Sequence, residues 1–383
     1  MLSPKPPPRL LLSCGEPSGD AYGGELVAQL RSTRPELVAF GLGGDKAEAA
    51  GVQLVAHVRD VAVVGLFEVV KHLAELRSIF KRILAEVDRL RPDVAVLVDY
   101  PDFNLRLARE LKRRGIPIVY YVSPQVWAWR RGRIRTIRDN VARMLVLFPF
   151  EEQIYREAGV PVCFVGHPLL DHVKPVADKA ATLRELGVDP ARPVLAVLPG
   201  SRPQEVKHNL PPLLGALERI GARRPDVQFL LAAAPSLPED IFAAARTRPG
   251  VQLVRGRTHE ALASASVGVV ASGTATVEAA LQGLPMVVVY RVSPLTYALG
   301  RPLLRVNQFA MVNLIAGRAV VPELMQADFT AERVANEALA LLEDPTRAAK
   351  MREDLAEVRR RLGEPGAAAR AAAVVAGYLP RVT

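Results

Sequence analysis

The chain has 383 residues, 50% of them hydrophobic, and a net charge of +10 from 50 Lys and Arg against 40 Asp and Glu. The length predicts two or three domains, and the two cysteines, Cys14 and Cys163, exclude a disulfide framework and fit a reducing cytoplasm. Apolar runs are too short for a membrane span, the start lacks the apolar core of a signal peptide, and the basic surface favours nucleic acid, anionic lipid or a phosphorylated substrate.

Short apolar runs alternate with longer amphipathic stretches, a pattern typical of parallel sheets covered by helices. Strands are expected near residues 10–13, 38–41, 94–98, 118–122, 144–147 and 163–165, and then near 194–198, 229–232, 252–254, 267–270 and 286–289. Helices are expected at 24–32, 68–90, 105–114 and 151–158. The fold class is therefore α/β, with two Rossmann-like, doubly wound parallel-sheet domains facing each other across a cleft and ligands at the carboxyl ends of strands.

The expected boundaries follow from a change of composition. Residues 1–170 form the first domain, a polar and proline-bearing passage at 171–192 is a linker, and residues 193–345 form the second domain. Residues 346–383 are helical by propensity and are expected to pack back on the first domain.

In chain order, the first glycine-containing turn carries Glu16, Ser18 and Asp20 directly after a strand. These residues would lie in the cleft, although a tight turn without a ligand explains the local sequence equally well. Residues 61–70, VAVVGLFEVV, follow and are unusually apolar for a loop. A buried core face is one interpretation, and a groove for acyl chains or a membrane-contacting surface is the other. The second interpretation assigns this role to four residues, Val64, Leu66, Phe67 and Val70.

The strand at 94–98 ends in Asp99-Tyr100-Pro101-Asp102-Phe103-Asn104. Asp102 is expected to cap a helix that begins near Phe103. Asp99 has no such local duty, so it is the candidate general base that removes a proton from an attacking hydroxyl, with a structural ion pair as the alternative. Asn104 is placed on the acceptor side of the cleft.

Residues 120–138 contain both tryptophans and five arginines. Arg131, Arg135 and Arg138 have helical spacing, so the segment is a solvated basic helix, a single-stranded nucleic-acid site, or a basic edge that meets anionic lipid or a phosphorylated acceptor. Trp127 is assigned to the acceptor side.

Residues 194–206, VLAVLPGSRPQEV, run from an apolar strand into a helix and predict an anion site. Gly200 can adopt a conformation closed to other residues, Ser201 and Gln204 have the spacing of a capping box, and Pro203 suits a first helical turn. Backbone N–H groups at a helix start attract anions, and Arg202 adds a forked cation suited to phosphate. An ordinary turn with a solvated arginine is the alternative.

A second loop, residues 269–278, repeats this arrangement with Ser272, Gly273 and Thr274 at a helix start. Glu278 follows one turn later, where its carboxylate could accept hydrogen bonds from a ribose; a capped helix without a ligand is the alternative. Two such loops in one sheet favour a nucleotide diphosphate. The dinucleotide fingerprint, the Walker loop, HExxH and Asp-x-Asp patterns are all missing from the sequence, so no metal site and no cofactor are expected.

Ten motifs in order resemble the lipid A disaccharide synthase family, inverting glycosyltransferases of the two-domain GT-B architecture. They are GEPSGD, GLGG, VGLFEVV, DYPDFN, YVSPQVWAWR, PFEEQIY, VGHPLLD, LPGSRPQEV, ASGTATVE and NLIAG. The resemblance implies transfer of 2,3-diacylglucosamine from UDP to the 6-hydroxyl of 2,3-diacylglucosamine 1-phosphate, giving a β-1,6-linked disaccharide phosphate and UDP. It also implies a bacterial enzyme peripheral to the anionic inner face of the inner membrane, without metal or cofactor, and a homo-oligomer is a further expectation.

By the same resemblance, Asp99 matches the catalytic base, Arg202 matches the donor-site arginine, and Asn313 is expected near the nucleotide. The chain departs from the family where it reads Asp45-Lys46 after the paired glycines and Val312 before NLIAG. Two rival functions remain. One is another UDP-sugar enzyme of this architecture, such as a peptidoglycan glycosyltransferase or a UDP-N-acetylglucosamine epimerase, and the other is a basic nucleic-acid-binding protein.

Overall fold

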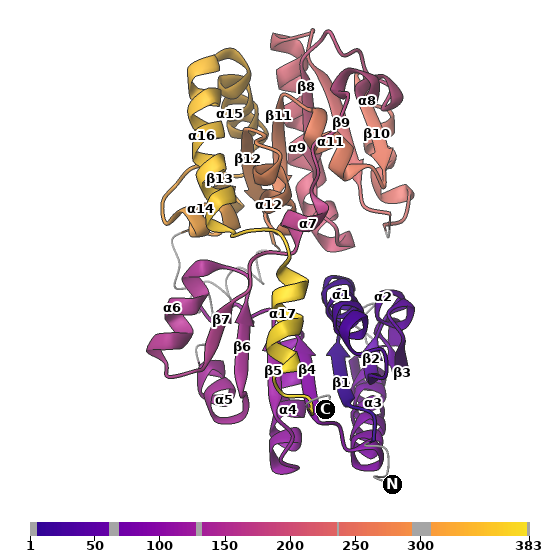
Figure 1. Ribbon diagram of the computed structural model, residues 1–383. Helices are drawn as coiled ribbons and strands as arrows, with labels where there is room; N and C mark the ends of the chain where they lie inside the picture. Colours follow the sequence, from indigo (N-terminus) through magenta and orange to yellow (C-terminus); the bar gives the residue numbers. More distant parts are fainter. Residues whose placement is uncertain (1–5, 61–68, 128–131, 236, 293–307, 381–383) are drawn as a thin grey trace. The chain divides into compact units, whose positions relative to one another are not determined.

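The computed structural model describes residues 6–60, 69–127, 132–235, 237–292 and 308–380, without the side chains of 69–73. The chain divides into two compact units. Unit 1 comprises Met1–Pro168 and Gly363–Thr383, and unit 2 comprises Leu169–Leu362. Each unit has a parallel sheet of its own (Figure 1).

The sheet of unit 1 has the order β3-β2-β1-β4-β5-β6-β7. Its strands are β1 (Arg9–Cys14), β2 (Val38–Gly43), β3 (Val52–His57), β4 (Val94–Val98), β5 (Ile118–Tyr121), β6 (Arg143–Val146) and β7 (Val162–Phe164). All pairs are parallel. The central strands are apolar on both faces because helices cover both, as parallel sheets require.

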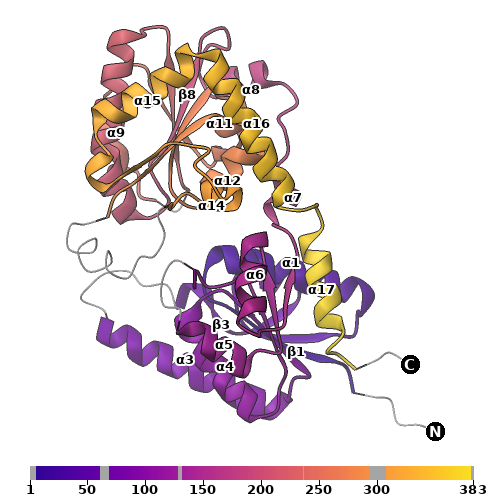
Figure 2. The ribbon, with the colours of Figure 1, turned by 90° about the vertical axis from the view of Figure 1, so that its left-hand side faces the viewer.

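The helices of unit 1 are α1 (Pro17–Thr33), α2 (Asp45–Ala49), α3 (Val69–Leu90), α4 (Pro101–Arg113), α5 (Arg133–Asn140), α6 (Pro149–Glu157) and α17 (Ala367–Ala376), with a short 3-10 turn at Val58–Asp60. One core contains residues of α3, α4, α5 and α6, and the other contains residues of α1 and α17. Alternate β1 residues divide between them, since Leu11 packs in the first and Leu12 in the second. Figure 2 shows α17 beside α1.

The sheet of unit 2 has the order β10-β9-β8-β11-β12-β13. Its strands are β8 (Val194–Leu198), β9 (Gln228–Ala233), β10 (Val251–Arg255), β11 (Val267–Ala271), β12 (Met286–Tyr290) and β13 (Glu323–Met325). Strand β8 pairs with β9 on one side and with β11 on the other. The strand order along the sheet therefore changes direction between β8 and β11. Such a reversal is where doubly wound sheets bind ligands, at the carboxyl ends of the strands.

The helices of unit 2 are α7 (Leu169–His172), α8 (Lys179–Glu185), α9 (Pro203–Arg223), α10 (Ala243–Arg246), α11 (Thr258–Ser264), α12 (Thr274–Leu281), α14 (Met311–Ala316), α15 (Ala331–Glu343) and α16 (Pro345–Arg361), with 3-10 turns at Asp240–Phe242 and Gln326–Asp328. Helices α9 and α15 pack against each other, while α12 contacts α11, α14 and α16.

Two details differ from the expected organisation. The passage at 171–192 contains α8 and belongs to unit 2, and α16 also belongs to unit 2, so that only α17 joins unit 1. Strands β3 and β13 were missed, because β3 has exposed and half-buried residues along it and β13 has only 3 residues. The two expected α/β sheets are confirmed, whereas the cleft between the domains stays a prediction.

Candidate active site

The corner after β8 needs a glycine at position 200. The φ of Gly200 is +128°, and a Cβ atom there would lie 2.8 Å from both Cβ and Oε2 of Glu205. Pro203 is the first residue of α9, where a helix has no internal use for its N–H. The predicted roles of Gly200 and Pro203 in shaping this corner are confirmed.

The helix begins one residue later than expected, and its capping partner is Glu205 rather than Gln204. Oε2 of Glu205 accepts hydrogen bonds from the backbone N–H groups of Ser201 at 3.1 Å and Arg202 at 3.3 Å. The predicted pairing of Ser201 with Gln204 is wrong because Arg202, not Ser201, is the N-cap residue. Two amides expected to bind an anion are therefore hydrogen-bonded to a carboxylate of the chain itself.

Arg202 is the exposed cation of the corner. Its side chain is 69% exposed, and Nη1 lies 3.4 Å from Oε1 of Glu205, a contact weak enough for an incoming phosphate to replace. Asn209, which sequence reasoning missed, fixes the corner because its Nδ2 donates to the carbonyl of Pro199 at 2.8 Å. Asn209 is fully buried. The signal that the sequence offered for its role was a polar amide on the otherwise apolar face of a helix.

The second predicted loop follows β11, the strand paired with β8, so the structure brings the two loops to the same edge of one sheet. Ser272 donates its N–H to the carbonyl of Val289 at 2.9 Å, and its Oγ donates to the carbonyl of Phe309 at 3.4 Å. Gly273 is the N-cap of α12, and both Gly273 and Thr274 are exposed. Their N–H groups lie at the exposed N-terminus of α12, a position that favours binding of an anion.

Glu278 lies one turn into α12 and is half-buried. Burial raises the pKa of its carboxyl, and the positive charge that His259 can carry on α11 opposes that shift. The carboxyl therefore faces the α11 side of the helix. Its predicted contact with a ribose stays a prediction.

Asn313 lies on α14 and is 1% exposed. Both the nitrogen and the oxygen of its side-chain amide form hydrogen bonds within the protein. Nδ2 donates to Oε1 of Glu323 at 2.6 Å and to the carbonyl of Val321 at 3.0 Å, while Oδ1 accepts from the N–H groups of Val320 and Val321. Glu323 in turn accepts from the backbone of Phe309 and so fixes the start of α14. Asn313 thus shapes the segment behind the loops that follow β8 and β11 rather than offering a free amide to them.

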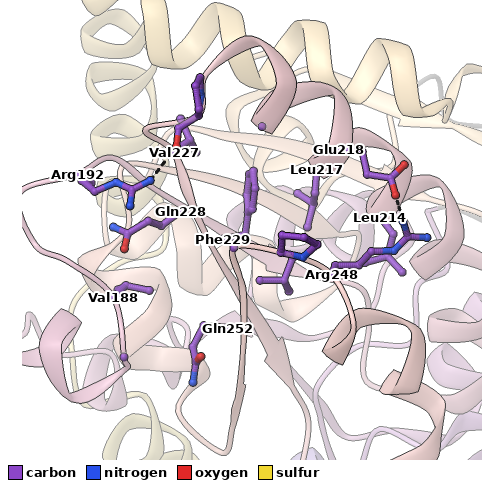
Figure 3. Close-up of a pocket in the computed structure, with 16 residues that line it drawn as sticks. Val188, Arg192, Leu214, Leu217, Glu218, Val227, Gln228, Phe229, Arg248 and Gln252 are labelled. Carbon is purple, nitrogen blue, oxygen red and sulfur yellow. Dashed lines mark hydrogen bonds and ion pairs between the residues drawn. The ribbon is translucent and has the colours of Figure 1, made fainter.

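Unit 2 also has a cavity of about 600 Å³, which lies away from the loops that follow β8 and β11 (Figure 3). Gln228, Phe229 and Gln252 line it from the first residues of β9 and β10, which places it at the amino ends of these strands. Arg248 on its wall forms an ion pair with Glu218. Because nucleotide ligands of doubly wound sheets bind at the opposite edge, this cavity is not the donor site.

In unit 1, the proposed base Asp99 follows β4 in an unusual turn. Asp99 and Tyr100 have φ values of +46° and +47°, both in the left-handed region. Helix α4 begins at Pro101 with Tyr100 as its N-cap, so the prediction that Asp102 caps a helix near Phe103 is wrong. Asp102 is exposed in the first turn and accepts a hydrogen bond from Nη2 of Arg133 at 2.7 Å.

The first glycine loop has a buried carboxylate, Asp20, with a structural duty. Oδ1 of Asp20 accepts from the N–H groups of Gly44 at 2.6 Å and Ala47 at 3.0 Å, and Oδ2 accepts from that of Lys46 at 3.0 Å. Asp20 therefore fixes the start of α2, which includes the Asp45-Lys46 departure from the family pattern. Of its predicted companions on the acceptor side, Glu16 is the half-buried N-cap of α1 and Ser18 is exposed.

Trp127 is half-buried beside a carboxyl that sequence reasoning did not single out. Its Nε1 donates to Oε1 of Glu151 at 3.4 Å, and its ring meets that of Phe150 edge-on at 5.6 Å. Burial raises the pKa of Glu151 to about 8, although the backbone N–H of Phe148 opposes the shift by donating to Oε2 at 3.3 Å. Asn104, the other predicted acceptor residue, is fully buried.

Several predicted residues fall outside the described residues. Val64, Leu66 and Phe67 do, as does Arg131, and for Val70 only its place in α3 is described. Arg135 and Arg138 of α5 are exposed. Among the helices that the structure describes, none is long and apolar enough to cross a membrane. No cluster of three or more His, Cys, Asp or Glu that could hold a metal ion occurs in the same part of the chain.

Solved structures define the class. The glycosyltransferase of kitacinnamycin matches with a TM-score of 0.63 and 18% identity, covering 98% of this chain and 100% of that one. The UDP-GlcNAc 2-epimerase from Neisseria meningitidis, bound to UDP-GlcNAc, matches with a TM-score of 0.63 and 10% identity over 96% of this chain and 98% of that one. With two parallel α/β sheets, the fold is that of the GT-B glycosyltransferases.

The sequence comparison is more specific than the fold. The family model of lipid-A-disaccharide synthetase matches residues 10–376. The lipid-A-disaccharide synthase of Myxococcus xanthus (strain DK1622) is 47% identical over 377 residues, 98% of each chain. That of Anaeromyxobacter dehalogenans (strain 2CP-C) is 44% identical over 383 residues, 99% of this chain and 100% of the relative. The chain belongs to the lipid-A-disaccharide synthase family and is a glycosyltransferase with a UDP-sugar donor and an acceptor substrate.

Proposed function

We propose that this enzyme transfers 2,3-diacylglucosamine from UDP-2,3-diacylglucosamine to the 6-hydroxyl of 2,3-diacylglucosamine 1-phosphate. The products are the β-1,6-linked disaccharide 1-phosphate of lipid A and UDP. The observation that carries the proposal is the family match over residues 10–376, together with relatives named lipid-A-disaccharide synthase that align along nearly the whole chain.

The proposed reaction is a single in-line displacement at the anomeric carbon. The carboxylate of Asp99 takes the proton of the acceptor hydroxyl while that oxygen attacks. The bond from the anomeric carbon to the diphosphate breaks on the opposite face, so the configuration inverts and UDP leaves with the electron pair. This scheme needs no metal ion and no cofactor, because a cation of the protein meets the charge of the leaving group.

Unit 2 binds the UDP part of the donor in this proposal. Arg202 turns its guanidinium from Glu205 to the diphosphate, and the starts of α9 at Arg202–Pro203 and of α12 at Gly273–Thr274 add positive potential at the same sheet edge. The support for this assignment is that the two loops follow paired parallel strands. Glu278 is assigned to the ribose and Asn313 to holding the segment behind it.

Unit 1 contributes the base and the acceptor side, to which Glu16, Ser18 and Trp127 are assigned. The apolar segment with Val64, Leu66, Phe67 and Val70 holds the acyl chains or touches the membrane. With the basic surface of the protein, this segment supports peripheral binding to the anionic inner face of the inner membrane from the cytoplasm. A homo-oligomer is a further expectation.

The test is incubation of the purified enzyme with both substrates and detection of the disaccharide by mass. We expect a product whose mass is that of the two substrates together minus that of the released UDP, and Asp99→Asn should depress turnover strongly without unfolding the protein. A folded Asp99→Asn variant with a nearly normal rate would rule out the base. Processing of a UDP-sugar without acyl chains would instead favour another enzyme of this architecture.

A further inference from the structure

The turn that presents Asp99 is sterically unfavourable for the residues that form it. Asp99 and Tyr100 both have φ values near +46°, a region that residues with a Cβ atom rarely adopt, and neither is a glycine. Two such residues in succession persist only where surrounding contacts hold them. Because the first of them is the proposed base, these contacts bear on catalysis.

Two buried side chains hold the turn through a single atom, the backbone carbonyl oxygen of Asp99. Nδ2 of Asn104 donates to it at 2.8 Å, and the hydroxyl of Tyr120 donates to it at 2.6 Å. The N–H of Asp99 donates to the carbonyl of Tyr121 at 2.9 Å, which continues the pairing of β4 with β5. The peptide groups on both sides of the Asp99 Cα are thereby fixed, and with them the direction of its Cα–Cβ bond.

Asn104 is itself held in one orientation. The Ser13 hydroxyl donates to its Oδ1 at 2.7 Å, which leaves Nδ2 to donate to the carbonyls of Ser13, Val98 and Asp99. Ser13 lies at the end of β1, Val98 at the end of β4, and Tyr120 in β5. Three neighbouring strands thus meet at the residue that carries the proposed base.

The Tyr120 hydroxyl, which donates to the Asp99 carbonyl, stays protonated in this setting. Burial is the main reason why the pKa of Tyr120 lies far above its ordinary value, and the negative charge of Asp99 is the next. Tyr120 therefore stays protonated and remains a hydrogen-bond donor over the whole range in which an enzyme works.

We propose that Asn104 and Tyr120 are positioning residues that act on the reaction through Asp99, by holding its carbonyl so that the strained turn keeps the carboxylate in place. Neither needs to touch a substrate. This inference rests on the proposed function of Asp99 as the base. If the two residues were merely structural, replacing them would lower the stability of the protein, and any effect on the rate would be the same with and without the Asp99 carboxylate.

The sharpest probe is Tyr120→Phe, which removes one hydroxyl and keeps the ring in the core. Tyr155→Phe is the matched control, since Tyr155 is equally buried and its hydroxyl hydrogen-bonds to Ser123 at 2.9 Å. We expect kcat for disaccharide formation to fall about tenfold in Tyr120→Phe, as the loss of one hydrogen bond to a strained group predicts, with the donor KM within about twofold. Tyr155→Phe should keep kcat within about twofold. Asn104→Ala should lower kcat further, with circular dichroism to check its fold.

The decisive measurement places Tyr120→Phe in an Asp99→Asn background. If Tyr120 acts through Asp99, the residual rate of Asp99→Asn will not fall further when the hydroxyl is removed. Equal losses in both backgrounds, or a normal kcat in Tyr120→Phe, would overturn the positioning role. A nearly normal rate in Asp99→Asn alone would overturn the proposed base instead, so the two failures are distinguishable.

Discussion

The ring of Tyr100 lies directly against the Cα of Gly15, so that a Cβ atom at position 15 would be 2.1 Å from Cγ and Cδ1 of that ring. No alanine fits at such a distance unless the ring moves. Tyr100 also stacks on Phe103 of α4, with ring centroids 5.6 Å apart. The glycine that follows β1 is therefore required by the turn that follows β4.

Gly15→Ala should displace the Tyr100 ring and with it the turn at Asp99. We expect kcat to fall at least about tenfold, and the free energy of unfolding to fall by about 1–3 kcal/mol, as for other overpacked sites. Steady-state kinetics and urea unfolding would measure the two effects. Gly132→Ala is the control, since nothing lies within 4 Å of a Cβ there.

The clash can be relieved to test its cause. In the double variant Gly15→Ala/Tyr100→Ala the ring is absent. Its loss of unfolding free energy should therefore be smaller than the sum of the losses in the two single variants. Additive losses would show that Gly15 is needed for some reason other than the Tyr100 ring.

Arg202→Ala should lower kcat more than it raises the donor KM, because charge on the departing diphosphate grows during the reaction. A fixed cation at such a charge contributes about 3–4 kcal/mol, so kcat should fall about 10²–10³-fold. Arg202→Lys should restore part of the rate, since it keeps the charge but loses the fork. A rise in KM at constant kcat would mean that Arg202 contributes only to ground-state binding.

Glu205→Gln tests whether the resident carboxylate competes with phosphate at the corner after β8. Glutamine retains an acceptor for the N–H groups of Ser201 and Arg202 but removes the charge next to the guanidinium. We expect UDP to bind about two- to fivefold more tightly at low ionic strength, and the gain to shrink as salt is added. Calorimetric titration with UDP would measure it, and weaker binding would show that the carboxylate supports the site.

The sequence predicted the central strands of both sheets because they are continuous apolar runs, and it placed the two proposed donor loops in one sheet. It did not find Glu205 as the capping partner, since serine and glutamine offered a box one residue earlier. It also did not give Asp20 its role, because the amides that this carboxylate binds lie 24 to 27 residues away. The left-handed turn at Asp99 was equally hidden, since it depends on side chains of other strands.

The apolar segment at residues 61–70 gives a prediction about substrates. Leu66→Ser/Val70→Ser should weaken the use of acylated acceptor much more than the binding of UDP, because the variant loses apolar contacts with acyl chains or with the membrane. Ile83→Ala is a control for core damage, since Ile83 is fully buried on α3, the helix that contains Val70. Assays in mixed micelles and UDP titrations would compare the two effects. Equal losses on both sides would show that the segment is ordinary core.

Glu151 gives a prediction about pH. Its pKa is raised to about 8 in the folded protein, whereas an unfolded glutamate titrates near 4.5, so the folded state holds a proton that the unfolded state has lost. The stabilising contribution is complete below about pH 4.5, declines as pH rises toward 8, and changes no further above it. His167 has the opposite sense: burial lowers its pKa to about 4, so its contribution declines only as pH falls below about 6.5.

Between about pH 6.5 and 7, Glu151 should therefore lower the free energy of unfolding by about 1.4 kcal/mol per pH unit, and this slope should fall to about half as the pH reaches 8. Glu151→Gln, a neutral side chain of the same shape, should remove that slope. Glu152→Gln on the same helix should keep it, because Glu152 is only partly buried and forms an ion pair with the exposed Arg156. Urea unfolding at several pH values would measure the slopes. An unchanged slope in Glu151→Gln would mean that the carboxyl is ionised in the folded protein, and that the contacts from Trp127 and the Phe148 N–H outweigh its burial.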